Sequence, residues 1–87
     1  MSDNTKPAAR VIMHPVKAAI WKNETEKGEV FYNVTFERSY RNLSGEWQSS
    51  DSYGVGDLLL LAKAADLAHT EIIKLRAKDR KSQQTEE

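Results

Sequence analysis

Hydrophobic and polar residues alternate most clearly between residues 29 and 41. The apolar or aromatic members of this pattern are Val30, Tyr32, Val34 and Phe36. Because successive side chains of a strand point to opposite faces, this period of two predicts a long strand with one face on a core. A weaker alternation over residues 16–22 predicts a second strand. The polar segment 23–28, which ends in glycine, predicts a hairpin loop between the two.

Two shorter segments have the composition of further strands. Residues 10–13 contain a Val-Ile-Met cluster that ends before a proline, a residue that cannot donate a hydrogen bond within a sheet. Residues 46–53 are polar except for Trp47 and Tyr53, and they follow the turn-forming segment 42–45. The predicted sheet therefore has three strands, or four if residues 10–13 belong to it.

From Asp57 onward the apolar residues recur every three or four positions. These positions are Leu58, Leu61, Ala65, Ala68, Ile72 and Leu75. This spacing predicts an α-helix, with Asp57 as an N-terminal cap or first-turn residue. A helix over residues 57–76 would be about 30 Å long. The chain is thus predicted to be an α+β domain, an antiparallel β-meander of three to four strands followed by one long C-terminal helix.

The length of 87 residues favours a single core. We assign residues 10–76 to one domain that contains the sheet and the helix. Residues 1–9 are mostly polar and include a proline, so they are predicted to form a flexible N-terminal arm. Residues 77–87 are predicted to form a flexible, charged C-terminal tail.

The predicted helix carries more apolar residues than one small sheet is expected to cover. The four consecutive leucines, residues 58–61, point in every direction around it. A homodimer explains such a helix most simply, because one side can pack on its own sheet and the other on a second copy. The expected dimer contacts are Leu58, Leu59, Leu61, Ala65, Ala68 and Ile72. The alternative is a monomer whose helix exposes a few alanines.

Charge and cysteine content narrow the possible classes of protein. Thirteen Lys and Arg residues balance thirteen Asp and Glu residues, so the composition carries no strongly basic signal for nucleic acid or membrane. The chain has no cysteine, which excludes disulfides and thiolate metal sites. We find no secretory signal pattern and no apolar stretch of the ~20 residues that a membrane span needs. A cytoplasmic protein without a membrane partner is expected.

No pattern of catalytic or metal-binding residues stands out. His14 and His69 are far apart, and neither has another ligand at a known spacing. Gly54 and Gly56 precede the helix, but glycines are expected wherever a chain turns sharply from a sheet into a helix. No serine lies in a pattern that would activate it as a nucleophile. We therefore expect a protein that is not an enzyme and that uses no cofactor, metal or small-molecule substrate.

The strand face turned away from the core carries the most informative residues. If the alternating apolar residues point inward, the outward set is Lys17, Trp21, Phe31, Asn33, Thr35 and Arg41. Aromatic rings on an antiparallel sheet can stack unpaired bases while neighbouring cations hold the phosphates, at about 1–3 kcal/mol per stacked base. This combination indicates single-stranded nucleic acid.

Two points about this face stay open at the level of sequence. Trp21 and Phe31 could instead stabilise the hairpin as a cross-strand pair, or be covered by the terminal arm or a second chain. A bulge near residue 39 would reverse the faces of the residues that follow it. The residues left unassigned for this reason are Arg38, Tyr40 and Trp47.

The order of the segments resembles a known family. The segments are Val16 to Trp21, Val30 to Tyr40, Gly45-Glu46-Trp47, and the leucines that follow Asp57, with Glu37-Arg38-Ser39-Tyr40 as the most similar stretch. Over about residues 10–76 they resemble the C-terminal domain of the positive cofactor four family of transcriptional coactivators, and the plant Whirly proteins share the theme. The resemblance implies the fold of single-stranded-DNA-binding transcriptional regulators: a curved antiparallel sheet, and a helix through which two chains dimerise. It implies DNA contacts at Lys17, Trp21, Lys22, Arg38 and Arg41.

The leading hypothesis is a homodimeric, non-catalytic module that binds single-stranded DNA or RNA, as a transcriptional regulator or coactivator would. Its candidate contact residues are Lys17, Trp21, Lys22, Phe31, Arg38 and Arg41. The alternative is a small homodimeric protein-interaction or scaffold domain of the same fold, whose strand face or helix recruits another protein. The neutral charge favours the alternative, and the aromatic strand face favours nucleic-acid binding.

Overall fold

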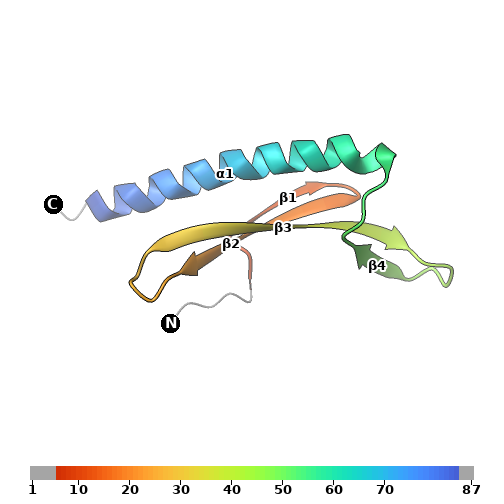
Figure 1. Cartoon of the computed structure of the whole chain (residues 1–87), viewed down its shortest axis with the longest axis horizontal. Helices are drawn as coiled ribbons and strands as arrows, with labels where there is room; N and C mark the ends of the chain where they lie inside the picture. Colours follow the sequence, from red (N-terminus) through yellow and green to blue (C-terminus); the bar gives the residue numbers. More distant parts are fainter. Residues whose placement is uncertain (1–5, 85–87) are drawn as a thin grey trace.

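The computed structural model describes residues 6–84 of the chain. These residues form four antiparallel strands and a C-terminal helix (Figure 1). The strands are β1 (Ala9–Met13), β2 (Val16–Glu24), β3 (Val30–Arg41) and β4 (Trp47–Ser50). A short 3-10 helix, η1 (Val55–Asp57), leads into the helix α1 (Leu58–Gln84). The sheet has the order β1-β2-β3-β4, so consecutive strands are neighbours. The predicted α+β fold, a meander followed by one long helix, is confirmed.

Strand pairing continues without a break from β2 through β3 to β4. Residues 30–38 of β3 pair one by one with β2, and residues 38–41 pair one by one with β4. The strand therefore has no bulge near Ser39, and its side chains alternate along its whole length. Even-numbered residues of β2, β3 and β4 lie on the side that carries α1, here called the helix face. Odd-numbered residues lie on the opposite side, here called the outer face, and β1 has the reverse numbering because Val11 pairs with Ala18.

The hydrophobic core lies between α1 and the first two strands. Val16, Ala18 and Ile20 of β2 are no more than 1% exposed, and so are Ala64 and Ala68 of α1. Residues four positions apart lie on one side of a helix, and small side chains there let the helix approach the sheet closely. The helix consequently runs along the strands and packs on β1 and β2 more than on β3 (Figure 1).

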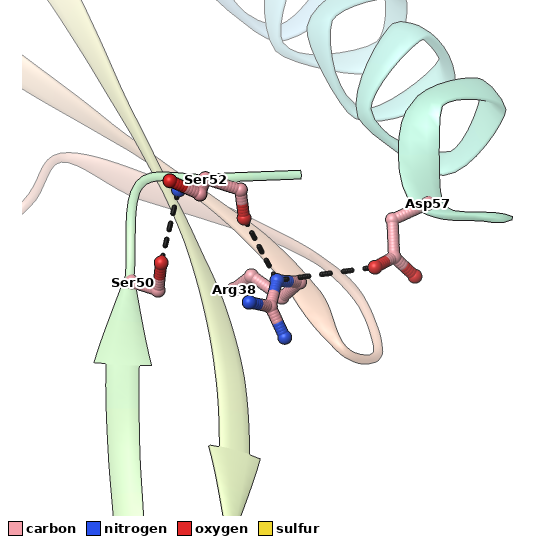
Figure 2. A network of polar contacts seen from close by, with 4 residues as sticks. All are labelled: Arg38, Ser50, Ser52 and Asp57. Carbon is pink, nitrogen blue, oxygen red and sulfur yellow. Dashed lines mark hydrogen bonds and ion pairs between the residues drawn. The ribbon is translucent and has the colours of Figure 1, made fainter. Parts of the chain in front are cut away.

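Polar contacts attach α1 to the sheet near both of its ends. At its start, Arg38 Nε donates a hydrogen bond to the main-chain oxygen of Ser52 (2.8 Å) and lies 3.9 Å from a carboxylate oxygen of Asp57 (Figure 2). Towards its other end, Asp79 accepts a hydrogen bond from the Tyr32 hydroxyl (2.5 Å) and pairs with Lys22 at 3.5 Å. The attachment to the sheet thus continues beyond residue 76, where the apolar spacing of the helix stops.

The two segments predicted to be flexible are described in part. Ala9 belongs to β1, and the N–H of Ala8 donates to the main-chain oxygen of Ile20 at 2.7 Å. Residues 77–84 continue α1. Main-chain pairing and the continuation of a helix leave no apolar pattern in the sequence. For this reason the sequence predicts residues 8–9 to belong to the arm and residues 77–84 to the tail. The predictions for residues 1–5 and 85–87 lie outside the described residues.

The residues predicted to form a dimer interface are divided between two sides of α1. Ala68 is 1% exposed, and Leu61 and Ile72 pack against the core of their own chain. Leu58 and Leu59 are 48% and 83% exposed, and Ala65 is exposed as well. The sheet thus covers more of the apolar side of the helix than the sequence suggested. Dimerisation through α1 stays a prediction.

Replacing Tyr32 with phenylalanine tests the contact between β3 and the far end of α1. Burial raises the pKa of the Tyr32 hydroxyl from 10.0 to about 12, with further contributions from the hydrogen bond to Asp79 and from its negative charge. Between these values the unfolded chain loses the proton and the native chain keeps it. The free energy of unfolding should therefore fall as the pH rises from about 10 to about 12.

The variant should lose about 1 kcal/mol of stability at pH 8, because the hydrogen bond to Asp79 is absent, and should show a smaller fall above pH 10. Urea titrations followed by Trp fluorescence at several pH values measure both effects. An unchanged pH dependence in the variant would contradict the proposed role of this hydroxyl.

Candidate nucleic-acid interface

The outer face of the sheet combines aromatic and basic side chains. Its aromatic residues are Trp21, Phe31 and Trp47, and its basic residues are Arg10, Lys17 and Arg41. Among the described strand residues, Glu37 is the only acidic one on this face. The neutral chain therefore has a local excess of positive charge here. The helix α1 packs on the opposite, helix face (Figure 1), and the Phe31 and Trp47 rings are 44% and 57% exposed.

A shallow hollow of about 310 Å³ lies on the outer face of β1, β2 and β3. The outer-face residues that line it are Arg10, Ile12, Lys17, Ala19, Trp21, Thr35 and Glu37. Ile12, opposite Lys17, is 63% exposed and adds apolar surface to the same hollow. The hollow thus offers an aromatic ring close to cations, which is the combination that a stacked base and its phosphate require.

Trp21 is held in place by a neighbouring strand. Its Nε1–H donates a hydrogen bond to the Thr35 hydroxyl oxygen at 2.9 Å. Trp21 lies opposite Asn33, and Phe31 lies opposite Asn23, so the two rings are not a directly opposed pair. The hydrogen bond satisfies the polar atom of the indole and fixes its orientation, which leaves the ring as a preformed surface for stacking.

A second aromatic group lies where β3 pairs with β4. The Arg41 guanidinium carbon is 5.0 Å from the centroid of the Trp47 ring, which is 57% exposed. His14, between β1 and β2, meets the same ring edge-on at a centroid distance of 6.0 Å. A cation over an indole is an attractive contact, and it keeps the charge of Arg41 beside an exposed ring.

Lys22 and Arg38 lie on the helix face, away from the other candidate contact residues. Lys22 pairs with Asp79, and Arg38 contacts Ser52 and Asp57 (Figure 2). Both cations attach α1 to the sheet. The structure thus divides the six predicted contact residues: it brings Lys17, Trp21, Phe31 and Arg41 to one face and places these two on the other.

Three outer-face residues were missing from the predicted set. Arg10 lies in the short strand β1, where an alternation of five residues gives little signal. The sequence does not assign Trp47 to a face, because its face depends on the register of β3. The bulge-free register places it outward. His14 is brought to Trp47 by the turn between β1 and β2, a contact that no local pattern reports.

A metal site, a membrane-spanning helix and similarity to known proteins were each considered for this chain. Within residues 6–84 there is no cluster of three or more His, Asp or Glu side chains that could hold a metal ion. None of the described helices is long and apolar enough to cross a membrane. Comparison with models of known families, with curated proteins and with solved structures gave no match to this chain. The resemblance to the positive cofactor four family therefore stays a prediction.

Proposed function

We propose that the outer face binds single-stranded nucleic acid and that the protein acts without catalysis, as a regulator or coactivator of transcription would. The observation that carries this proposal is the gathering of Trp21, Phe31 and Trp47 with Arg10, Lys17 and Arg41 on one face of the sheet. Stacking on aromatic rings needs bases whose faces are free, as they are in single strands. A duplex hides those faces, so it would meet only the cations.

The chemistry divides between rings, cations and neutral polar groups. Bases stack on Trp21 in the hollow and on Trp47 near the end of the sheet, at about 1–3 kcal/mol for each base. Lys17 and the two outer-face arginines meet the phosphates. The face also carries uncharged polar side chains that can bond base edges, among them Asn33, Thr35, Ser39 and Ser49.

The second candidate function is recruitment of another protein by the same face. Ile12 favours it, because this isoleucine is 63% exposed on β1 and nucleic-acid binding has no need of an aliphatic side chain. Exposed apolar residues at the centre of a polar surface are typical of protein-binding sites. The two functions differ in their salt dependence, since phosphate contacts release counterions and apolar contacts do not.

Replacing matched cations on the two faces with glutamine tests the proposal. Lys17→Gln and Arg41→Gln remove outer-face charges, whereas Lys22→Gln and Arg38→Gln remove the same residue types from the helix face. We expect the outer-face variants to bind single strands several-fold more weakly. For these variants, the slope of log K against the logarithm of the salt concentration should be smaller in magnitude by about 0.7 for each lost phosphate contact. The helix-face variants should bind like the unaltered protein, although they are less stable.

Fluorescence titrations of labelled single-stranded and double-stranded oligonucleotides at two or more salt concentrations measure these constants. Absence of single-strand binding at low salt would exclude nucleic acid and favour the protein-binding function. Equal losses from both pairs of variants would show that general charge, and not the outer face, determines affinity.

A further inference from the structure

One edge of β3 is open over most of its length. On one side, β3 pairs with β2 along residues 30–38. On the other side, β4 pairs only with residues 38–41, at the end of the strand (Figure 1). Within the described part of the chain, no strand pairs with this side of residues 30–37. An open edge of this length is a template for another strand.

The main-chain groups at this edge can be identified from the register. The N–H of Ser39 donates to the main-chain oxygen of Pro15 (2.9 Å), so the odd-numbered residues of β3 direct their main-chain groups towards β2. By alternation, the N–H and C=O groups of Tyr32, Val34 and Phe36 point to the open edge. Unpaired main-chain groups are stabilised when a further strand supplies hydrogen bonds.

Features that usually protect sheet edges are absent from this one. Residues 30–36 contain neither a charged residue nor a proline, and the nearest charged residues along the chain are Glu29 and Glu37. By contrast, the free edge of β1 belongs to a strand of five residues, which carries Arg10 and is flanked by Pro7 and Pro15. Short strands, charges and prolines prevent edge pairing, so β1 is protected and β3 is not.

The open edge is complementary to a second copy of itself. Antiparallel pairing about a two-fold axis at Asn33 places Tyr32 opposite Val34 of the second copy, and Val30 opposite its Phe36. All these side chains lie on the helix face and are apolar or aromatic, and Val30 is 39% exposed. On the outer face the same axis places Phe31 opposite Thr35. Like charges, Glu29 and Glu37 of the second copy, meet only beyond the ends of the paired residues 30–36.

The position of β4 selects this register. A two-fold axis at residue 34 would pair Val30 with Arg38 of the second copy, but the edge of Arg38 is already occupied by Ser50. The axis at Asn33 uses all of residues 30–36 and stops before β4. Ile72 and Arg76 of α1 line a hollow with Val30, Phe31 and Tyr32, so α1 borders the seam.

We propose that two copies of the chain join at the open β3 edges, antiparallel and about a two-fold axis at Asn33. The axis is perpendicular to the sheet, so the two outer faces lie on the same side and form one continuous surface. A single strand of nucleic acid could then pass from one copy to the other. The dimer does not depend on the proposed function, because it is tested without nucleic acid.

A cross-link at the axis tests both the dimer and its register. The chain has no cysteine, so Asn33→Cys introduces the only thiol. Asn33 would face its own counterpart at a position without mutual hydrogen bonds, where the Cα atoms are about 4.5 Å apart and a disulfide can form. We expect mild oxidation to convert most of this variant to a covalent dimer. Ser44→Cys, in the turn before β4, is the control and should stay largely uncross-linked.

Sedimentation provides the second measurement. The unaltered protein should sediment as a dimer, and Val30→Lys should shift it towards the monomer by placing a charge in the seam. Leu43→Lys, at an exposed apolar residue outside the edge, should leave the dimer intact. A monomer at micromolar concentration would overturn the proposal. A dimer in which Asn33→Cys cross-links no faster than the control would overturn it too, because the copies would then meet elsewhere.

Discussion

Replacing Trp21 with leucine is expected to weaken single-strand binding by about 5- to 150-fold. The indole is the ring of the outer-face hollow, and a stacked base contributes about 1–3 kcal/mol, which corresponds to that range of affinity. Leucine keeps an apolar side chain on β2 and removes the aromatic face. Fluorescence anisotropy of a labelled oligonucleotide gives the two dissociation constants.

Two further variants separate stacking from folding. Trp21→Phe keeps an aromatic ring but loses the hydrogen bond to Thr35, so it should bind within a few-fold of the unaltered protein. Tyr40→Leu removes an exposed ring from the helix face and should leave affinity unchanged. If Tyr40→Leu weakened binding as much as Trp21→Leu, the outer face would not be the binding surface. Circular dichroism would establish that each variant is folded.

Replacing Ile20 with alanine is expected to lower the free energy of unfolding by about 2–5 kcal/mol. Ile20 is fully buried, with 0% exposure, between the sheet and the two buried alanines of α1. Alanine would leave a cavity that the packed helix can close only in part. For a domain of this size the loss is a large part of the total stability. Urea unfolding followed by circular dichroism measures it.

Ile12 offers a matched control for this substitution. It lies in the same sheet, on β1, but on the outer face and 63% exposed. Ile12→Ala removes the same atoms from a position already in contact with water, so its effect should stay within about 0.5 kcal/mol. Similar losses at both positions would mean that α1 does not pack on β2 as described.

The local patterns of the sequence predicted most of the fold. The alternation in residues 16–22 and 29–41 defined β2 and β3, and apolar spacing after Asp57 defined α1, although not its extension to Gln84. Within the extension, Asp79 contacts Tyr32 and Lys22 of the sheet. A single acidic residue near the end of a chain carries no local sign of such a contact.

The strand alternation already separates two of the predicted contact residues. Lys17 and Lys22 are separated by an odd number of positions on one strand, so the alternation already places them on opposite faces. The faces of Arg38 and Trp47 do not follow from alternation alone, because they depend on whether β3 contains a bulge. The sequence does not report bulges, whereas the register of three paired strands does.

By itself, the sequence determined the order of the elements and the outward side of β2 and β3, because a period of two or of about 3.6 residues is a property of neighbouring positions. The tertiary structure decided which cations attach α1 to the sheet and which lie on the outer face, since Lys22 and Arg38 are paired by residues distant along the chain. It also decided that β4 covers only the end of β3. Strand pairing joins separate segments, so its extent cannot be derived from the pattern of either strand alone.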